Sequence, residues 1–237
     1  MSQKIRNESK TVFVTGGTSG IGLALSRGFV AAGHRVYAAG LGDLPDGDEY
    51  LSFHNLDVTD ETAILALVDT FERLDVLINA AGVIRRVDEL KPEVFASVID
   101  INLNGTMRCC AAARSLLSKS NGCIINMASM LSYFGGGLIP AYAASKGGVA
   151  QLTKSLAIAY ATDGIRVNAL APGYMSTPMT SALRTDAERN KVIVDRTPLA
   201  RWGQPEELVG PALFLASEGA SFVTGAVLNV DGGYSIM

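Results

Sequence analysis

The chain has 237 residues, of which 48% are hydrophobic and 18% are charged, and its formal net charge is -3. This composition allows a sizeable apolar core and excludes wholesale disorder, and the small mixed charge gives no basis for binding nucleic acid. No uncharged apolar stretch is long enough to span a bilayer, and the first ten residues lack the apolar core of a signal peptide, so we expect a soluble, cytoplasmic protein without membrane partners.

Short apolar segments alternate with longer helical patterns along almost the whole chain. Segments that are apolar on both faces predict strands at 11–15, 35–39, 51–54, 75–79, 123–127, 166–170 and 226–230. Helical patterns predict helices at 21–32, 61–73, 141–161 and 205–215, with two more between 92 and 118. Buried strands separated by helices predict an α/β fold: one Rossmann-type domain over 1–237, with a doubly wound sheet of about seven parallel strands.

The segment 174–202 does not follow this alternation. It is polar, contains Pro178 and Pro198, and has a short helical pattern at 181–194. It follows the end of a predicted strand, and ligands bind at the carboxyl ends of strands in such folds. The sequence leaves two interpretations open: an ordinary surface excursion, or a mobile lid over a pocket.

A glycine-rich loop joins the first predicted strand to the first helix. It reads Thr15-Gly16-Gly17-Thr18-Ser19-Gly20-Ile21-Gly22, a Gly-x-x-x-Gly-x-Gly spacing that departs from the commoner Gly-x-Gly-x-x-Gly fingerprint. Glycines let the backbone approach a pyrophosphate, and a helix amino terminus offers free N–H groups and a positive dipole end. The loop therefore predicts a dinucleotide site.

Polar residues also follow the third and fourth predicted strands, at the same edge of the sheet. Asp57 and Val58 follow the third strand, where they could meet an adenine edge. Asn79, Ala80 and Gly82 lie at the end of the fourth, where they could line a ribose and stabilise the sheet. Both positions extend the predicted nucleotide site.

Tyr142 and Lys146 are four residues apart in a predicted helix, so their side chains share one face. An ammonium in that position favours the phenolate and lowers the pKa of the tyrosine. The hydroxyl of Ser129, shortly upstream, could hold the oxygen that gains or loses the proton. Such a pair is common by chance, and the surrounding motifs are what point to proton transfer.

Metal chemistry is not expected. Cys109, Cys110 and Cys123 are not spaced from one another, or from His34 and His54, as metal ligands would be. We therefore predict buried thiols that act as small apolar groups, and no metal site.

In their order and approximate spacing, these motifs resemble the classical short-chain dehydrogenase/reductase family over residues 11–234. The resemblance rests on the glycine-rich loop, 79–82, Asn102, Ser129, Tyr142 with Lys146, and Pro172-Gly173 with Thr177. The stretches 82–86, 129–137, 171–177 and 201–203 further resemble the branch of 2-deoxy-gluconate and 2-keto-3-deoxy-gluconate dehydrogenases.

The resemblance implies a role for each of these positions. Tyr142 would be the general acid/base, and Lys146 would lower its pKa and bond the nicotinamide ribose. Ser129 would orient the substrate oxygen, and Asn102 would complete a proton relay through water. The nicotinamide end would be held by Pro172, Gly173, Met175 and Thr177. The implied reaction is hydride transfer between nicotinamide and a small-molecule secondary alcohol or ketone, and the implied assembly is a homotetramer.

The sequence favours NAD over NADP as cofactor. Family members that use NAD usually carry an acidic residue at the end of the second strand, where Gly40 and Leu41 stand here. No arginine or lysine occupies Gly40, Leu41 or Ser19 to pair with a 2′-phosphate. Asp43, slightly beyond, either replaces the missing acid or is a solvated loop residue.

The substrate is less defined. Arg85 or Arg86 could clamp the carboxylate of a sugar acid, or both could be solvated. Arg184, Arg189 and Arg196 in the presumed lid are comparable candidates. Alternatives within the family are a polyol dehydrogenase, a 3-oxoacyl carrier-protein reductase, and a small alcohol or aldehyde dehydrogenase.

Two alternatives belong to other classes of protein: a dinucleotide-binding redox sensor without turnover, and a purely structural subunit. The joint presence of Ser129, Tyr142 and Lys146 argues against a sensor, which needs no proton-transfer group.

Overall fold

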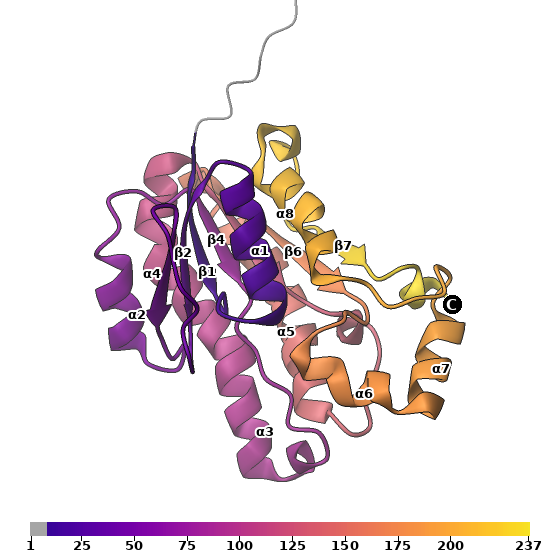
Figure 1. The fold of residues 1–237 in the computed structure, drawn as a ribbon. Coiled ribbons are helices and arrows are strands. Elements are labelled where there is room, and N and C mark those ends of the chain that lie inside the picture. The colour runs from indigo at the N-terminus through magenta and orange to yellow at the C-terminus, as the bar shows by residue number, and fades with distance from the viewer. Residues whose placement is uncertain (1–8) are drawn as a thin grey trace, which may run out of the picture.

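A computed structural model describes residues 9–237, and its centre is a seven-stranded sheet (Figure 1). The strands are β1 (Thr11–Thr15), β2 (Arg35–Gly40), β3 (Leu51–Asn55), β4 (Val76–Asn79), β5 (Cys123–Met127), β6 (Arg166–Pro172) and β7 (Val227–Val230). All neighbouring strands are parallel, in the order β3-β2-β1-β4-β5-β6-β7. The predicted Rossmann-type sheet is confirmed, and no strand boundary differs from its prediction by more than two residues.

Helices cover both faces of the sheet because its strands are apolar on both sides. In β1, Val12 and Val14 face one layer of helices and Phe13 faces the other, and all three are fully buried. The first layer is α1 (Gly20–Ala31) and α8 (Val209–Ala216). The second is α2 (Glu61–Val68), α4 (Gly105–Ser120) and α5 (Pro140–Ala159). This arrangement leaves the carboxyl ends of the strands as the edge where a site can open.

The prediction for α2 is too long by five residues. Asp60 caps the helix by accepting the N–H of Ala63 at 3.0 Å. At the other end, both the hydroxyl and the N–H of Thr70 bond the carbonyl of Leu67, at 2.7 and 3.1 Å. These bonds close the last turn, and Phe71 then enters the core.

The two helices predicted between 92 and 118 are joined without a break. α3 (Pro92–Ile99) continues through a π-helical segment, Asp100–Asn104, into α4. The hydroxyl of Thr106 bonds the carbonyl of Asn102 at 2.8 Å, inside this wider turn. π-helical turns often occur at functional sites, and this one carries a predicted site residue.

The segment 174–202 leaves the sheet after β6 and forms two short helices, α6 (Ser181–Thr185) and α7 (Ala187–Arg196). Figure 1 shows it in orange, set apart from the sheet at the lower right. Its mobility stays a prediction, as does the single-domain boundary; residues 1–8 lie outside the described part of the chain. None of the helices in residues 9–237 is long and apolar enough to cross a membrane.

Candidate active site

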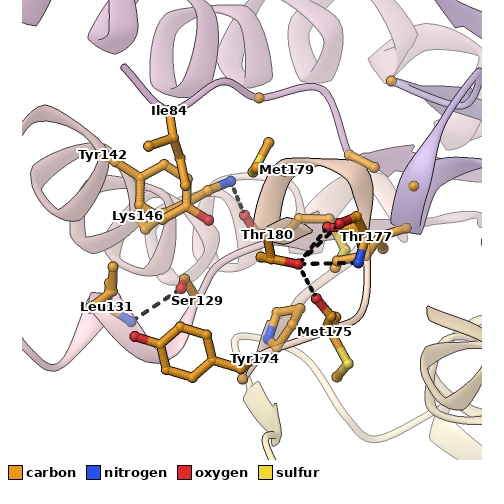
Figure 2. A pocket seen from close by; sticks show the side chains of 18 of the residues that line it. Ile84, Ser129, Leu131, Tyr142, Lys146, Tyr174, Met175, Thr177, Met179 and Thr180 are labelled. Carbon is orange, nitrogen blue, oxygen red and sulfur yellow. Dashed lines mark hydrogen bonds between the residues drawn. The ribbon is translucent and has the colours of Figure 1, made fainter. Parts of the chain in front are cut away.

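A cleft opens at the carboxyl ends of the central strands, beside the point between β1 and β4 where the strand order reverses (Figure 2). The predicted site residues that line it are Gly16, Ser19, Gly20, Ile21, Gly22, Ala80, Gly82, Ser129, Tyr142, Lys146, Pro172, Gly173, Met175 and Thr177. Arg86 lines it too and, with Lys146, makes up its charged side chains; among the described residues no acidic side chain lines it. The cleft therefore carries cationic groups without a carboxylate to neutralise them.

The glycine-rich loop has the shape that a pyrophosphate needs. Gly16 has a φ of 65°, and a Cβ there would lie 2.6 Å from the backbone of Ala81. A Cβ on Gly20, by contrast, would meet nothing closer than 3.8 Å. Ser19 precedes α1 and makes no side-chain capping bond, so the first N–H groups of the helix have no side-chain cap at the cleft. These features fit the phosphates of NAD or NADP.

Helix α5 brings Tyr142 and Lys146 to the cleft, and the end of β5 brings Ser129. The Lys146 Nζ lies 5.6 Å from the centre of the Tyr142 ring and donates a hydrogen bond to the carbonyl of Met127 at 2.7 Å. Ser129 opens a short turn after β5, and its Oγ accepts the N–H of Leu131 at 3.2 Å. Figure 2 shows these three side chains on one side of the cavity, opposite Thr177 and the residues that follow it.

The pKa of Tyr142 is raised in this structure, and Lys146 is not among the groups that shift it, so a lowering of this pKa by Lys146 stays a prediction. Burial is the largest cause, the hydrogen bond from Ser129 lowers the pKa, and the charge of Glu89 raises it. Burial also lowers the pKa of Lys146 to about 8. The i,i+4 spacing brings the two side chains close but does not reveal that Lys146 is buried and Tyr142 partly so.

Asn102 lies beneath the cleft and not in its lining. Its Nδ2 donates to the carbonyl of Val83 at 3.0 Å and to the Ser145 hydroxyl at 3.1 Å, and its Oδ1 accepts the N–H of Val83 at 2.8 Å. The side chain thus ties the segment after β4 to α5. Its role in a proton relay stays a prediction.

Asn79 supports the sheet from inside the core. Its Nδ2 donates to Asn126 Oδ1 at 2.9 Å and to Cys110 Sγ at 3.2 Å, and Asn126 donates in turn to Thr153 at 3.0 Å. The chain of bonds links β4, β5, α4 and α5. Among the described residues, Asn79 Oδ1 is the one buried side-chain polar atom without a partner.

Four predicted cofactor residues lie outside the lining: Thr18 of the glycine-rich loop, and Leu41, Asp57 and Val58 of the adenosine end. Leu41 is exposed, and Val58 is buried. The carboxylate of Asp57 accepts the N–H of Thr59 at 2.9 Å and its hydroxyl at 2.8 Å. Their contacts with a nucleotide stay predictions.

The structure separates the candidate arginines. Arg86 lines the cleft, whereas Arg85 and Arg184 do not. Arg196 stacks on the rings of Phe134 and Tyr234, at 5.0 and 4.4 Å, and Arg189 pairs with a neighbouring aspartate. Arg86 is therefore the candidate for a carboxylate clamp.

Among the residues of the site that sequence reasoning missed, Tyr174 and Glu89 have the most informative contacts. Tyr174 lines the cleft and packs edge-on against Trp202 and Tyr234, at 5.4 and 5.3 Å between ring centres. Glu89 is buried beside Tyr142, although it stands in a polar stretch that predicts a solvated loop. Tyr174 lies within the stretch 171–177, which resembles the sugar-acid dehydrogenase branch, whereas nothing in the sequence distinguishes Glu89.

Comparison with known proteins finds relatives that match almost the whole chain. Residues 16–235 match the family described as Enoyl-(Acyl carrier protein) reductase. The chain is 40% identical to 2-dehydro-3-deoxy-D-gluconate 5-dehydrogenase of Bacillus subtilis, covering 96% of this chain and 95% of that one. It is 39% identical to galactitol 2-dehydrogenase (L-tagatose-forming) of Cereibacter sphaeroides, covering 94% of each. The crystal structure of a gluconate 5-dehydrogenase from Burkholderia cenocepacia, in complex with NADP and tartrate, superposes with a TM-score of 0.89 at 34% identity, covering 98% of this chain and 97% of that one.

The burial of Lys146 gives a prediction about stability and pH. Because its pKa is lowered to about 8 from 10.5, the unfolded chain binds more protons between these values, and this lysine makes wild-type stability rise with pH there. Below pH 8 both states carry the ammonium and its full burial cost. The Lys146→Met variant lacks this dependence, so the wild type should gain on it by about 1 kcal/mol per pH unit between pH 8 and 10.

Urea unfolding at pH 7, 8.5 and 9.5 measures this difference. Lys154→Met replaces an exposed lysine of the same helix and is the matched control. A difference between Lys146→Met and wild type that stays constant with pH would contradict the prediction.

Proposed function

The chain belongs to the classical short-chain dehydrogenase/reductase family and is an NAD(P)-dependent dehydrogenase acting on CH–OH groups, and on this premise we propose that it oxidises a secondary alcohol of a sugar acid. The observation that carries the proposal is the meeting of Ser129, Tyr142 and Lys146 in a cleft whose charged side chains are all cationic. The similarity to dehydrogenases of 2-dehydro-3-deoxy-D-gluconate and gluconate supports the same substrate class.

The proposed mechanism divides the substrate's two hydrogens between two acceptors. Bound NAD(P) supplies the ring carbon that takes the hydride from the carbinol carbon. The Ser129 hydroxyl holds the substrate oxygen, and Tyr142 takes the hydroxyl proton. In the reverse direction Tyr142 returns that proton to the carbonyl oxygen. Because the pKa of Tyr142 is raised, it carries its proton at neutral pH, and alcohol oxidation should quicken as the pH rises.

Arg86 is the reason to propose a substrate that carries a carboxylate. Among the described residues, its guanidinium has no hydrogen-bond or ion-pair partner, although it lines the cleft. A guanidinium binds a carboxylate through two parallel hydrogen bonds, which fixes orientation as well as charge. A neutral polyol is the second candidate substrate, because the galactitol dehydrogenase is as similar to this chain as the sugar-acid enzymes.

We propose NAD as the preferred cofactor. No cationic side chain stands at Gly40, Leu41 or Ser19, where a 2′-phosphate would need one. The Burkholderia cenocepacia relative binds NADP, so the preference has to be measured in this chain.

The remaining proposals concern the lid, the assembly and the location. We propose that 174–202 forms a lid, which Met179 and Leu183 support because they line the cleft. The family resemblance implies a homotetramer, and the fully exposed Phe222 and the largely exposed Ile158 are consistent with subunit contacts. We also propose that the protein is located in the cytoplasm.

Tyr142→Phe tests the acid/base role. Removing the hydroxyl deletes the proton acceptor, so turnover should fall by about 10²- to 10⁴-fold while the Kd for the nucleotide changes little. Steady-state kinetics and a nucleotide titration measure the two effects. Wild-type turnover in this variant would refute the acid/base role of Tyr142 and the mechanism proposed with it.

Arg86→Ala tests the carboxylate clamp. Loss of a bidentate pair should raise KM for a sugar acid by about 10-fold or more, with little change for a neutral polyol. Arg85→Ala is the matched control, because that side chain does not line the cleft. Equal changes in KM for the acid and the polyol would exclude the clamp.

The cofactor preference is tested by titration with NAD and NADP. We expect NAD to bind about 10-fold or more tightly than NADP. Leu41→Arg should shift the ratio of the two Kd values towards NADP, because it adds a partner for the 2′-phosphate. Leu44→Arg, at another exposed leucine of the same loop, controls for the added charge. Tighter binding of NADP by the wild-type chain would show the proposal to be wrong.

A further inference from the structure

A buried carboxylate bridges two segments beside the cleft. Glu89 lies in the 3-10 turn Asp88–Leu90 and is only 1% exposed. Its Oε1 accepts the backbone N–H of Arg85 and its Oε2 that of Tyr142, each at 2.8 Å. A carboxylate removed from water needs charge-assisted bonds of this kind, and together they fix the side chain in one position.

The bond to Tyr142 completes the amino terminus of α5. Ile139, which precedes the helix, makes no side-chain capping bond. The first N–H groups of a helix lack partners within it, and the positive end of its dipole favours an anion. Glu89 supplies both the acceptor and the charge, from 53 residues away in the chain. The helix that carries the proton acceptor is thus anchored by a residue outside it.

The bond to Arg85 holds the segment that carries Arg86. The N–H of Glu89 bonds the carbonyl of Arg85 in return, at 3.0 Å, which closes a loop around Arg86 and Val87. Val87 has φ 71° and ψ -45°, a conformation that a β-branched residue rarely adopts. Its N–H is held by the carbonyl of Leu138 at 2.8 Å. A strained residue persists only where its surroundings impose it, so this loop is held in a defined shape.

We propose that Glu89 is a positioning residue, which fixes Tyr142 and Arg86 relative to each other so that a substrate held at its carboxylate presents its alcohol group to the phenol. This inference rests on the proposed function. One rigid side chain then sets the distance between the clamp and the proton acceptor, and a small misplacement of either slows the reaction.

Glu89 also acts on Tyr142 through its charge. The charged groups next to Tyr142 are Lys146 on α5 and Glu89 on the 3-10 turn, and Arg86 lines the same cleft. The end of β5 and the turn after it contribute a neutral carbonyl and the Ser129 hydroxyl. Within residues 9–237, Glu89 is the one charge whose effect on the pKa of Tyr142 is resolved, and it raises that pKa. Replacing Glu89 with a neutral amide should therefore lower the pKa of Tyr142. Tyr142 then loses its proton, and becomes able to accept the substrate's proton, at a lower pH.

Two substitutions separate geometry from charge. Glu89→Gln keeps the shape but leaves one N–H without an acceptor and removes the charge. We expect kcat/KM for a sugar acid to fall about 10- to 100-fold, and the acidic limb of the oxidation pH profile to move about half a unit or more to lower pH. Glu89→Asp keeps the charge but is too short to reach both N–H groups. It should lower kcat/KM similarly, with the acidic limb close to the wild-type pH.

Glu93→Gln is the matched control, because it removes an exposed charge four residues away, and it should change neither quantity. The Kd for NAD should stay within about twofold in all three variants, since the glycine-rich loop is untouched.

Wild-type kcat, KM and pH profile in Glu89→Gln would overturn the inference. A lower unfolding temperature with unchanged kinetics would also overturn it, because the role would then be structural alone. If Tyr142→Phe is inactive while Glu89→Gln is unaffected, only the positioning role fails. If Tyr142→Phe keeps its activity, the proposed acid/base role fails and the inference with it.

Discussion

The hydrogen bond from the Lys146 ammonium to the carbonyl of Met127 determines where the rest of the site stands. It joins α5 to the carboxyl end of β5, and Ser129 follows two residues later in the chain. A buried ammonium is costly unless it is hydrogen-bonded. A shift of the helix along the sheet would break this bond and leave the ammonium buried without an acceptor. Tyr142, one turn away on the same helix, is placed by the same contact.

The sequence was sufficient for the sheet because its strands are apolar on both faces. A short apolar segment such as 123–127, with a helix before and after it, is best assigned as a buried strand. The errors have local causes: α2 ends early because Thr70 closes its last turn, and the π-helical segment after α3 has no pattern that distinguishes it from ordinary helix. Hydrophobic periodicity reports which face is buried, and not how each turn is hydrogen-bonded.

The site was predictable where motifs mark it and not where burial decides. Spacing alone brought Tyr142 and Lys146 to one face, but it did not indicate that the pKa of Tyr142 is raised, with partial burial as the largest cause. The sequence does not distinguish Arg85 from Arg86. In the structure the backbone of the loop places Arg86, and not Arg85, in the lining of the cleft. Glu89 could not have been found, because its partners are backbone N–H groups brought together by the fold.

The π-helical segment between α3 and α4 has a consequence for how the chain tolerates insertions and deletions. Such a turn accommodates one residue more than an ordinary helical turn, and each residue rotates a helix by about 100°. Loss of one residue from 100–104 would leave a continuous, well-formed helix, yet would turn Asn102 or the whole of α4 away from its neighbours. The extra residue therefore encodes an angle, and selection acting on this stretch should guard its length more strictly than its amino-acid identities.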